Sequence, residues 1–224
     1  MPDIPTPPSP RLRAPRAAAI AGIVFSLLLI ASVVLVRISV PTDLDDGGAW
    51  LASSSNGKVA LAMNLVPFAG VAFLWFIGVL RDRLGANEDK LFATVFLGSG
   101  LLFLSMLFMA AALIGSILLV HESSGGSAQA PEVFRFARIA AYEILNIYAI
   151  KMAGVFMVVT STLGLRTRFI ARWVAFAGFA VAATLLLASR SNEWMVLVFP
   201  LWVLLLSLYI LVDNLGAAVT QPAA

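Results

Sequence analysis

The chain contains no cysteine and only one histidine, His121. The absence of cysteine excludes disulfides, thiolate catalysis, iron–sulfur clusters and cysteine-ligated zinc. A single histidine also excludes a haem that two histidines of the same chain would hold. His121 and its neighbour Glu122 fall short of the three or four ligands that zinc usually requires. The sequence therefore predicts no metal site and no cofactor.

Charged residues are also scarce, at 12% of the 224 residues, whereas 61% are hydrophobic. A soluble domain is nearer one quarter charged and one half apolar. The apolar residues form continuous runs rather than an alternating pattern, which indicates membrane spans. The net charge of +3 comes from arginines that flank these runs, so membrane topology explains it better than nucleic acid as a partner.

Six apolar runs predict an all-α fold, a polytopic membrane bundle of six transmembrane helices. The runs cover residues 17–36, 59–80, 91–120, 134–165, 169–188 and 194–212. Each approaches the ~20 residues that cross a hydrocarbon core. The third and fourth runs exceed this length and must tilt or project beyond the bilayer. The first run is longer than the apolar part of a signal peptide, ~7–15 residues, so we interpret it as an uncleaved span.

The distribution of lysine and arginine predicts the orientation of the bundle. With both termini in the cytoplasm, nine of these residues would lie on the cytoplasmic side and five outside, as the positive-inside rule favours. We expect three parts: a disordered, Pro-rich cytoplasmic tail over residues 1–15, the transmembrane domain over 16–214, and a short flexible tail over 215–224.

The fourth run carries a lysine near its middle. Lys151 lies almost midway between Arg138 and Arg166, close to the expected hydrocarbon midplane. A charge there costs at least ~2.5–3.5 kcal/mol. Glu143 lies about 12 Å away along an ideal helix, too far for direct pairing. Four resolutions stay open: a lowered pKa, hydrogen bonds to other helices, an anionic ligand, lipid or partner subunit, or a stem that snorkels towards water.

Polar residues of the fourth run share one face if the run is an ideal helix of ~100° per residue. They are Arg135, Arg138, Tyr142, Glu143, Asn146, Thr160 and Ser161. Lipid cannot satisfy such a stripe, so we expect it to face the bundle interior or a wet cavity.

Asn64 of the second run lies at a depth comparable with Glu143, close to Pro67. A hydrogen bond from Asn64 to Glu143 or Asn146 would join two helices, and this role is favoured over contact with a ligand. With the polar residues near the middle of the fourth run, Asn64 completes the set of candidate ligand-binding residues: Lys151, Glu143, Asn146, Asn64 and Tyr142.

Four short segments carry a resemblance to a known kind of membrane protein. They are residues 81–85 (RDRLG), 97–103 (LGSGLLF), 151–157 (KMAGVFM) and 165–168 (LRTR). With the apolar sequence between them, they resemble uncharacterised six-helix membrane proteins of high-GC actinobacteria. The resemblance covers most of the chain. It implies a multi-pass protein of a bacterial plasma membrane, and it supplies no catalytic residue.

Three classes of function fit these features unequally. The first is binding or transport of an anionic or amphiphilic small molecule or lipid at the polar site on the fourth run, with a homodimer expected for so small a carrier. The second is a non-catalytic accessory or assembly subunit of a larger membrane complex. An intramembrane enzyme is disfavoured, because the sequence has no HExxH motif, no GxSxG motif and no paired intramembrane aspartates.

Overall fold

The computed structural model describes residues 14–41, 51, 55–84, 90–123, 131–168, 170–187 and 193–219. All secondary structure in these ranges is helical, which confirms the predicted all-α class. The elements are α1 (Ala14–Ser39), α2 (Ser55–Leu84), α3 (Lys90–Ser123), α4 (Pro131–Glu143), the π-helix η2 (Ile144–Ala149), α5 (Ile150–Thr167), α6 (Arg172–Leu187), the 3₁₀-helix η3 (Glu193–Leu197) and α7 (Val198–Val219).

Five of the helical runs are long and apolar enough to cross a membrane, which is compatible with an integral membrane protein. The predicted fifth span is the exception. It forms α6, which has only 16 residues and therefore measures about 24 Å. A typical hydrocarbon core is ~30 Å thick. The described chain thus contains five helices of full length and one shorter apolar helix.

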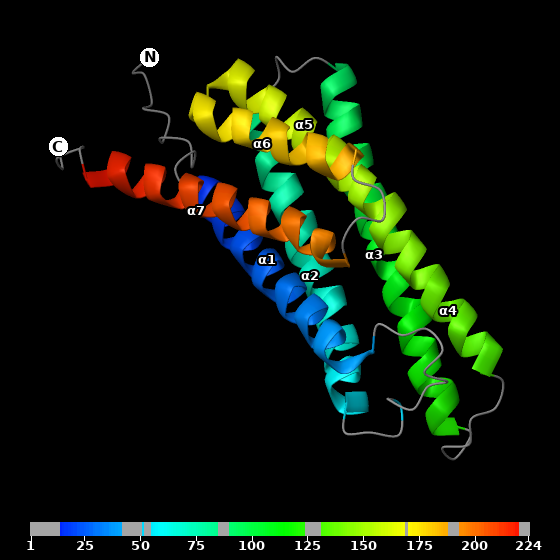
Figure 1. Ribbon diagram of the computed structural model, residues 1–224. Coiled ribbons are helices and arrows are strands. Elements are labelled where there is room, and N and C mark those ends of the chain that lie inside the picture. The colour runs from blue at the N-terminus through cyan, green and yellow to red at the C-terminus, as the bar shows by residue number, and fades with distance from the viewer. Residues whose placement is uncertain are drawn as a thin grey trace, which may run out of the picture.

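The helices reach into both predicted tails. α1 begins at Ala14, and α7 continues to Val219. The other residues of the expected tails, 1–13 and 220–224, lie outside the described residues. α1 begins and α7 ends at the same end of the bundle (Figure 1).

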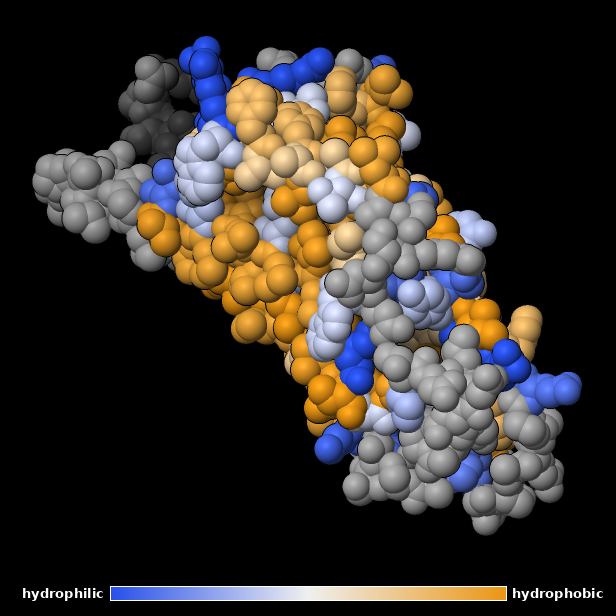
Figure 2. Space-filling view, in the orientation of Figure 1, coloured by the Kyte–Doolittle hydropathy of each residue, from blue (hydrophilic) through white to orange (hydrophobic). Residues whose placement is uncertain are grey.

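Two long runs lie side by side and form one edge of the molecule. α3 packs along α4, η2 and α5 (Figure 1), whereas α6 packs against α5. α1 packs against α2 and α7. Figure 2 shows a broad hydrophobic surface over α1 and α7, with hydrophilic side chains mainly near the two ends. This distribution fits a bundle whose middle faces lipid.

The centre of the bundle is a cluster of phenylalanine rings around Phe73 of α2. Ring centroids of Phe25, Phe103, Phe156 and Phe199 lie 4.5, 5.5, 5.5 and 5.8 Å from that of Phe73. These rings come from α1, α3, α5 and α7, and all of them are buried. Because lipid removes the hydrophobic effect between helices, close packing of this kind is what holds them together.

We expect Phe73→Ala to destabilise the protein by about 3–5 kcal/mol, because it leaves a cavity where five helices meet. The matched control is Phe136→Ala in α4, where the ring is 72% exposed. Thermal unfolding of both variants in one detergent measures the difference. Equal losses in the two variants would show that the cluster around Phe73 does not carry the stability of the bundle.

Candidate functional site

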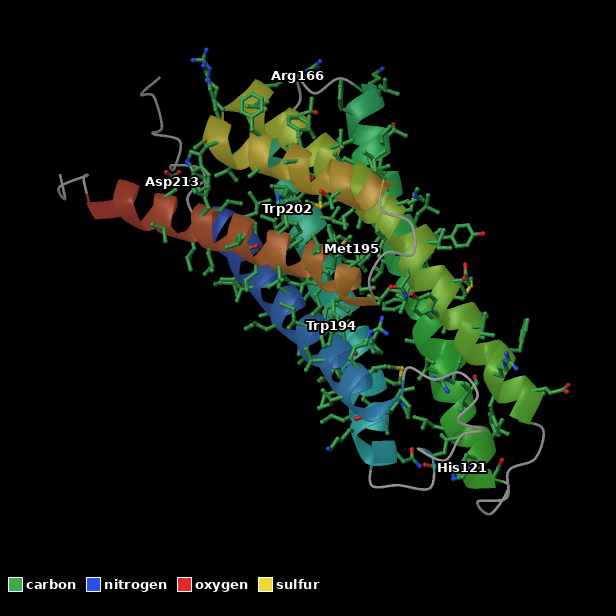
Figure 3. All side chains as sticks on the ribbon, in the orientation of Figure 1. His121, Arg166, Trp194, Met195, Trp202 and Asp213 are labelled. Atoms are coloured by element: carbon green, nitrogen blue, oxygen red, sulfur yellow. The ribbon has the colours of Figure 1, made fainter. Side chains whose placement is uncertain are left out.

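A cavity of about 460 Å³ lies between the last turns of α1 and the fourth predicted span, which the structure forms from α4, η2 and α5. We call these three elements the fourth span. Most of its lining is apolar and comes from α1, α2, α3, the fourth span and η3. η3 contributes Val196 to the lining, and the labelled Trp194 and Met195 of the same element lie where α7 begins (Figure 3). The lining side chains with a polar group are Ser32, Arg37, Arg138, Tyr142, Glu143 and Asn146.

The fourth span is not the uninterrupted α-helix on which the predicted stripe depends. The segment Ile144–Ala149 is a π-helix. The amide Nδ2 of Asn146 donates to the backbone carbonyl of Tyr142 over 3.0 Å. A side chain that takes a carbonyl out of the ordinary i to i−4 ladder is one recognised cause of a local break in a helix. Wide turns of this kind occur frequently at functional sites.

The wide turn divides the predicted polar stripe into two groups. A π turn holds about one residue more than an α turn, so later residues are rotated by roughly 100° from their ideal positions. Arg138, Tyr142, Glu143 and Asn146 face the cavity together. Ser161 is instead buried in the packing between helices, where a side chain on Gly178 of α6 would collide with its hydroxyl.

Asn146 presents an unsatisfied oxygen beside the cavity. Its side chain is only 5% exposed. Its Oδ1 is among the buried polar atoms that have no hydrogen-bond partner within the described residues. Because buried carbonyl oxygens almost always accept a hydrogen bond, this atom calls for a donor from a water or a ligand.

Among the described residues of the lining, the charged side chains are two arginines and one glutamate. Arg138 donates from Nη2 to the backbone carbonyl of Pro41 over 2.7 Å and so ties α4 to the end of α1. Arg37 of α1 and Glu143 line the same space. The described lining residues thus carry one more positive than negative charge, among mainly apolar side chains. An anionic group with an apolar tail matches this lining.

Lys151 lies outside the cavity, and its backbone partner is on another helix. Its Nζ donates to the carbonyl of Leu186 over 2.8 Å. α6 ends at Leu187, so this carbonyl is one of the last four, which have no partner within the helix. The negative end of the helix dipole lies there too and favours a cation. The structure therefore realises the second of the four resolutions, hydrogen bonding to another helix.

Gly154 allows α6 to pack closely against α5 beside Lys151. A Cβ atom at Gly154 would lie 2.9 Å from Leu186 Cγ and 3.4 Å from the carbonyl oxygen of Ala182. Gly154 follows Lys151 by three residues, so both lie on the same side of α5. The last turn of α6 thus packs against Gly154 and accepts a hydrogen bond from Lys151.

Asn64 is separated from the other candidates. Its side chain is exposed, whereas Met63 and Val66 of the same helix line the cavity. Of the five candidate residues, the structure brings together Glu143, Asn146 and Tyr142, and it places Lys151 and Asn64 elsewhere. Arg37 and Arg138 join the site. Arg138 belongs to the predicted polar stripe, whereas Arg37 stands out in the sequence only as a charge that flanks an apolar run.

No protein-family model, curated protein or solved structure matches this chain. Among the described residues there is no group of three or more metal-ligating side chains. The case for a function therefore depends on the geometry of the cavity.

We expect Lys151→Met to increase hydrogen–deuterium exchange in the last turn of α6, because the charge-assisted bond to Leu186 is lost. The matched control is Lys58→Met, since Lys58 is an exposed lysine of α2. Exchange in α6 that stays unchanged in Lys151→Met would contradict this role of the Lys151 hydrogen bond.

Proposed function

We propose that this chain is an integral protein of a bacterial plasma membrane that binds an anionic amphiphile in the cavity between α1 and the fourth span. Both termini face the cytoplasm in this proposal, in line with the excess of lysine and arginine at the ends that they share. The cavity then lies towards the outer leaflet. Its ligand would be a lipid or a lipid-like small molecule.

The observation that carries the proposal is the combination of lining groups. The cavity is mainly apolar, yet it presents Arg37, Arg138 and the buried Oδ1 of Asn146. Its volume of about 460 Å³ lies within the ~300–1,000 Å³ typical of ligand sites. Such sites combine apolar walls with a few polar groups that fix the orientation of the ligand.

Each part of an anionic amphiphile has a matching surface. The anionic group pairs with Arg37 and Arg138, whose guanidinium groups suit carboxylate or phosphate. A hydroxyl or N–H of the ligand donates to Asn146 Oδ1. The acyl chain lies against Leu29, Leu107 and other apolar residues of the lining. Glu143 disfavours a ligand with more negative charge than the two arginines can balance.

We expect Ala111→Phe to abolish retention of an anionic lipid, because Ala111 lines the cavity and a phenyl group would fill it. The matched control is Ala112→Phe at the next residue, which is exposed. Native mass spectrometry from nanodiscs of mixed anionic and zwitterionic lipid gives the number of lipids retained. Equal retention in both variants would contradict the proposal, and a copurifying protein subunit in place of lipid would favour the accessory role.

We expect Arg138→Gln to reduce the preference for anionic over zwitterionic lipid by about tenfold, as the loss of a charge-assisted hydrogen bond implies. Arg135→Gln is the control, because Arg135 lies about one turn away on the same helix and is exposed. Competition between the two lipids in the nanodisc measures the ratio. A fall of the same size in both variants would point to general surface charge rather than to the cavity.

A further inference from the structure

The exposed face of α2 carries one carboxamide among large apolar side chains. α2 packs on α1 and α3, and its opposite side is exposed with spacings of three and four residues. The face consists of Gly57, Leu61, Asn64, Phe68, Val71, Trp75 and Gly78. The spacing marks one straight seam along the helix. Large apolar side chains occupy it on both sides of a single carboxamide, that of Asn64.

Asn64 lies within the apolar part of α2 and not at its end. It belongs to the membrane-crossing segment Asn56–Arg81, six residues and therefore about 9 Å inward of Lys58. Its side chain is exposed and makes no hydrogen bond within the described part of the chain. A carboxamide in contact with lipid alone leaves two donors and an acceptor unsatisfied, which is costly.

Other exposed polar side chains of the apolar helices avoid this cost by bonding to their own backbone. Ser105 donates to the carbonyl of Leu101 over 2.9 Å, and Ser116 donates to that of Ala112 over 2.8 Å. Thr184 of α6 does the same. These hydroxyls are therefore compatible with lipid, whereas the carboxamide of Asn64 is not.

Pro67 adds a second unsatisfied group to the same turn. A proline has no N–H, so Pro67, which lies inside α2, cannot donate to the carbonyl of Met63. Pro67 is exposed and lies next to Phe68 of the seam. The turn thus offers the two N–H donors of Asn64, the Oδ1 of Asn64 and the freed carbonyl of Met63.

We propose that a second copy of this chain covers the α2 face and forms a twofold dimer in which the two Asn64 side chains hydrogen-bond to each other. Two copies inserted in the same direction bring their α2 helices together in parallel, so equal positions meet at equal depth. A carboxamide both donates and accepts, so an identical partner satisfies it. An Asn at a single seam position also fixes the register of two helices.

The ends of the seam allow the two helices to approach closely. A Cβ atom added at Gly57 or Gly78 would meet nothing within 4 Å in the single chain, so a partner has room there. The cavity lies on the other side of α2, where Met63 and Val66 line it. Dimerisation and lipid binding are therefore tested separately, and the failure of one leaves the other standing.

The absence of cysteine makes disulfide crosslinking a clean test in native membranes. The variants Leu61→Cys and Val71→Cys place one thiol on each side of Asn64 in the seam. Leu205→Cys is the control, since Leu205 is an exposed leucine of α7. We expect a crosslinked homodimer from the two α2 variants and little from the control. Equal crosslinking at all three positions, or crosslinking to a different protein, would overturn the proposal.

The role of the carboxamide itself is tested by Asn64→Leu and Asn64→Gln. Single-molecule photobleaching in dilute liposomes gives the fraction of dimer. Asn64→Leu should weaken dimerisation by about 5- to 30-fold, and Asn64→Gln should retain most of it because glutamine has the same amide. Since residue 64 is exposed in the single chain, both variants should unfold at the same temperature as the unchanged chain in a detergent that keeps the protein monomeric. An unchanged dimer fraction in Asn64→Leu would rule out the amide contact.

Discussion

Five helices meet on the ring of Phe73, and the positions of the other parts follow from this contact. In lipid, close packing must replace the hydrophobic effect between helices, and the phenylalanine cluster supplies it at the centre of the bundle. Leu29 and Leu107 follow Phe25 and Phe103 by four residues and line the cavity. Val196, which precedes Phe199 by three residues, lines it too. The cavity therefore begins where the ring packing stops, and the same helices form its walls.

The π-helix determines which polar side chains of the fourth span face the cavity and which face α6. Asn146 uses its Nδ2 on the Tyr142 carbonyl and keeps its Oδ1 at the cavity. After the wide turn, Lys151 meets the end of α6 instead of the cavity. A short helix that ends beside the fourth span gives the lysine a set of free carbonyls. α6 is short for a membrane span, and because it ends beside Lys151, one of its last carbonyls accepts the hydrogen bond from this lysine.

The sequence predicted the helical class and most helices because long apolar runs report them directly. It also predicted that Tyr142, Glu143 and Asn146 share a face, since these residues are separated by at most one turn. It could not predict the partner of Lys151, because that depends on where α6 ends, and a continuous apolar run does not show this. It could not predict the wide turn near Asn146 either, which rotates every later residue relative to an ideal helix. Ser161 lies in the interior as expected, but it packs against α6 and does not line the cavity.

α2 shows how one helix serves two surfaces at the same depth. Met63 faces the cavity, and Asn64, its neighbour in sequence, faces outward. Pro67 removes a backbone hydrogen bond from the turn that carries both, so this turn is the easiest part of α2 to deform. A displacement that improves packing on one side changes the geometry on the other. Any coupling that results must be reciprocal. If a bound ligand changes the affinity of the two copies for each other, dimerisation changes the affinity for the ligand by the same factor.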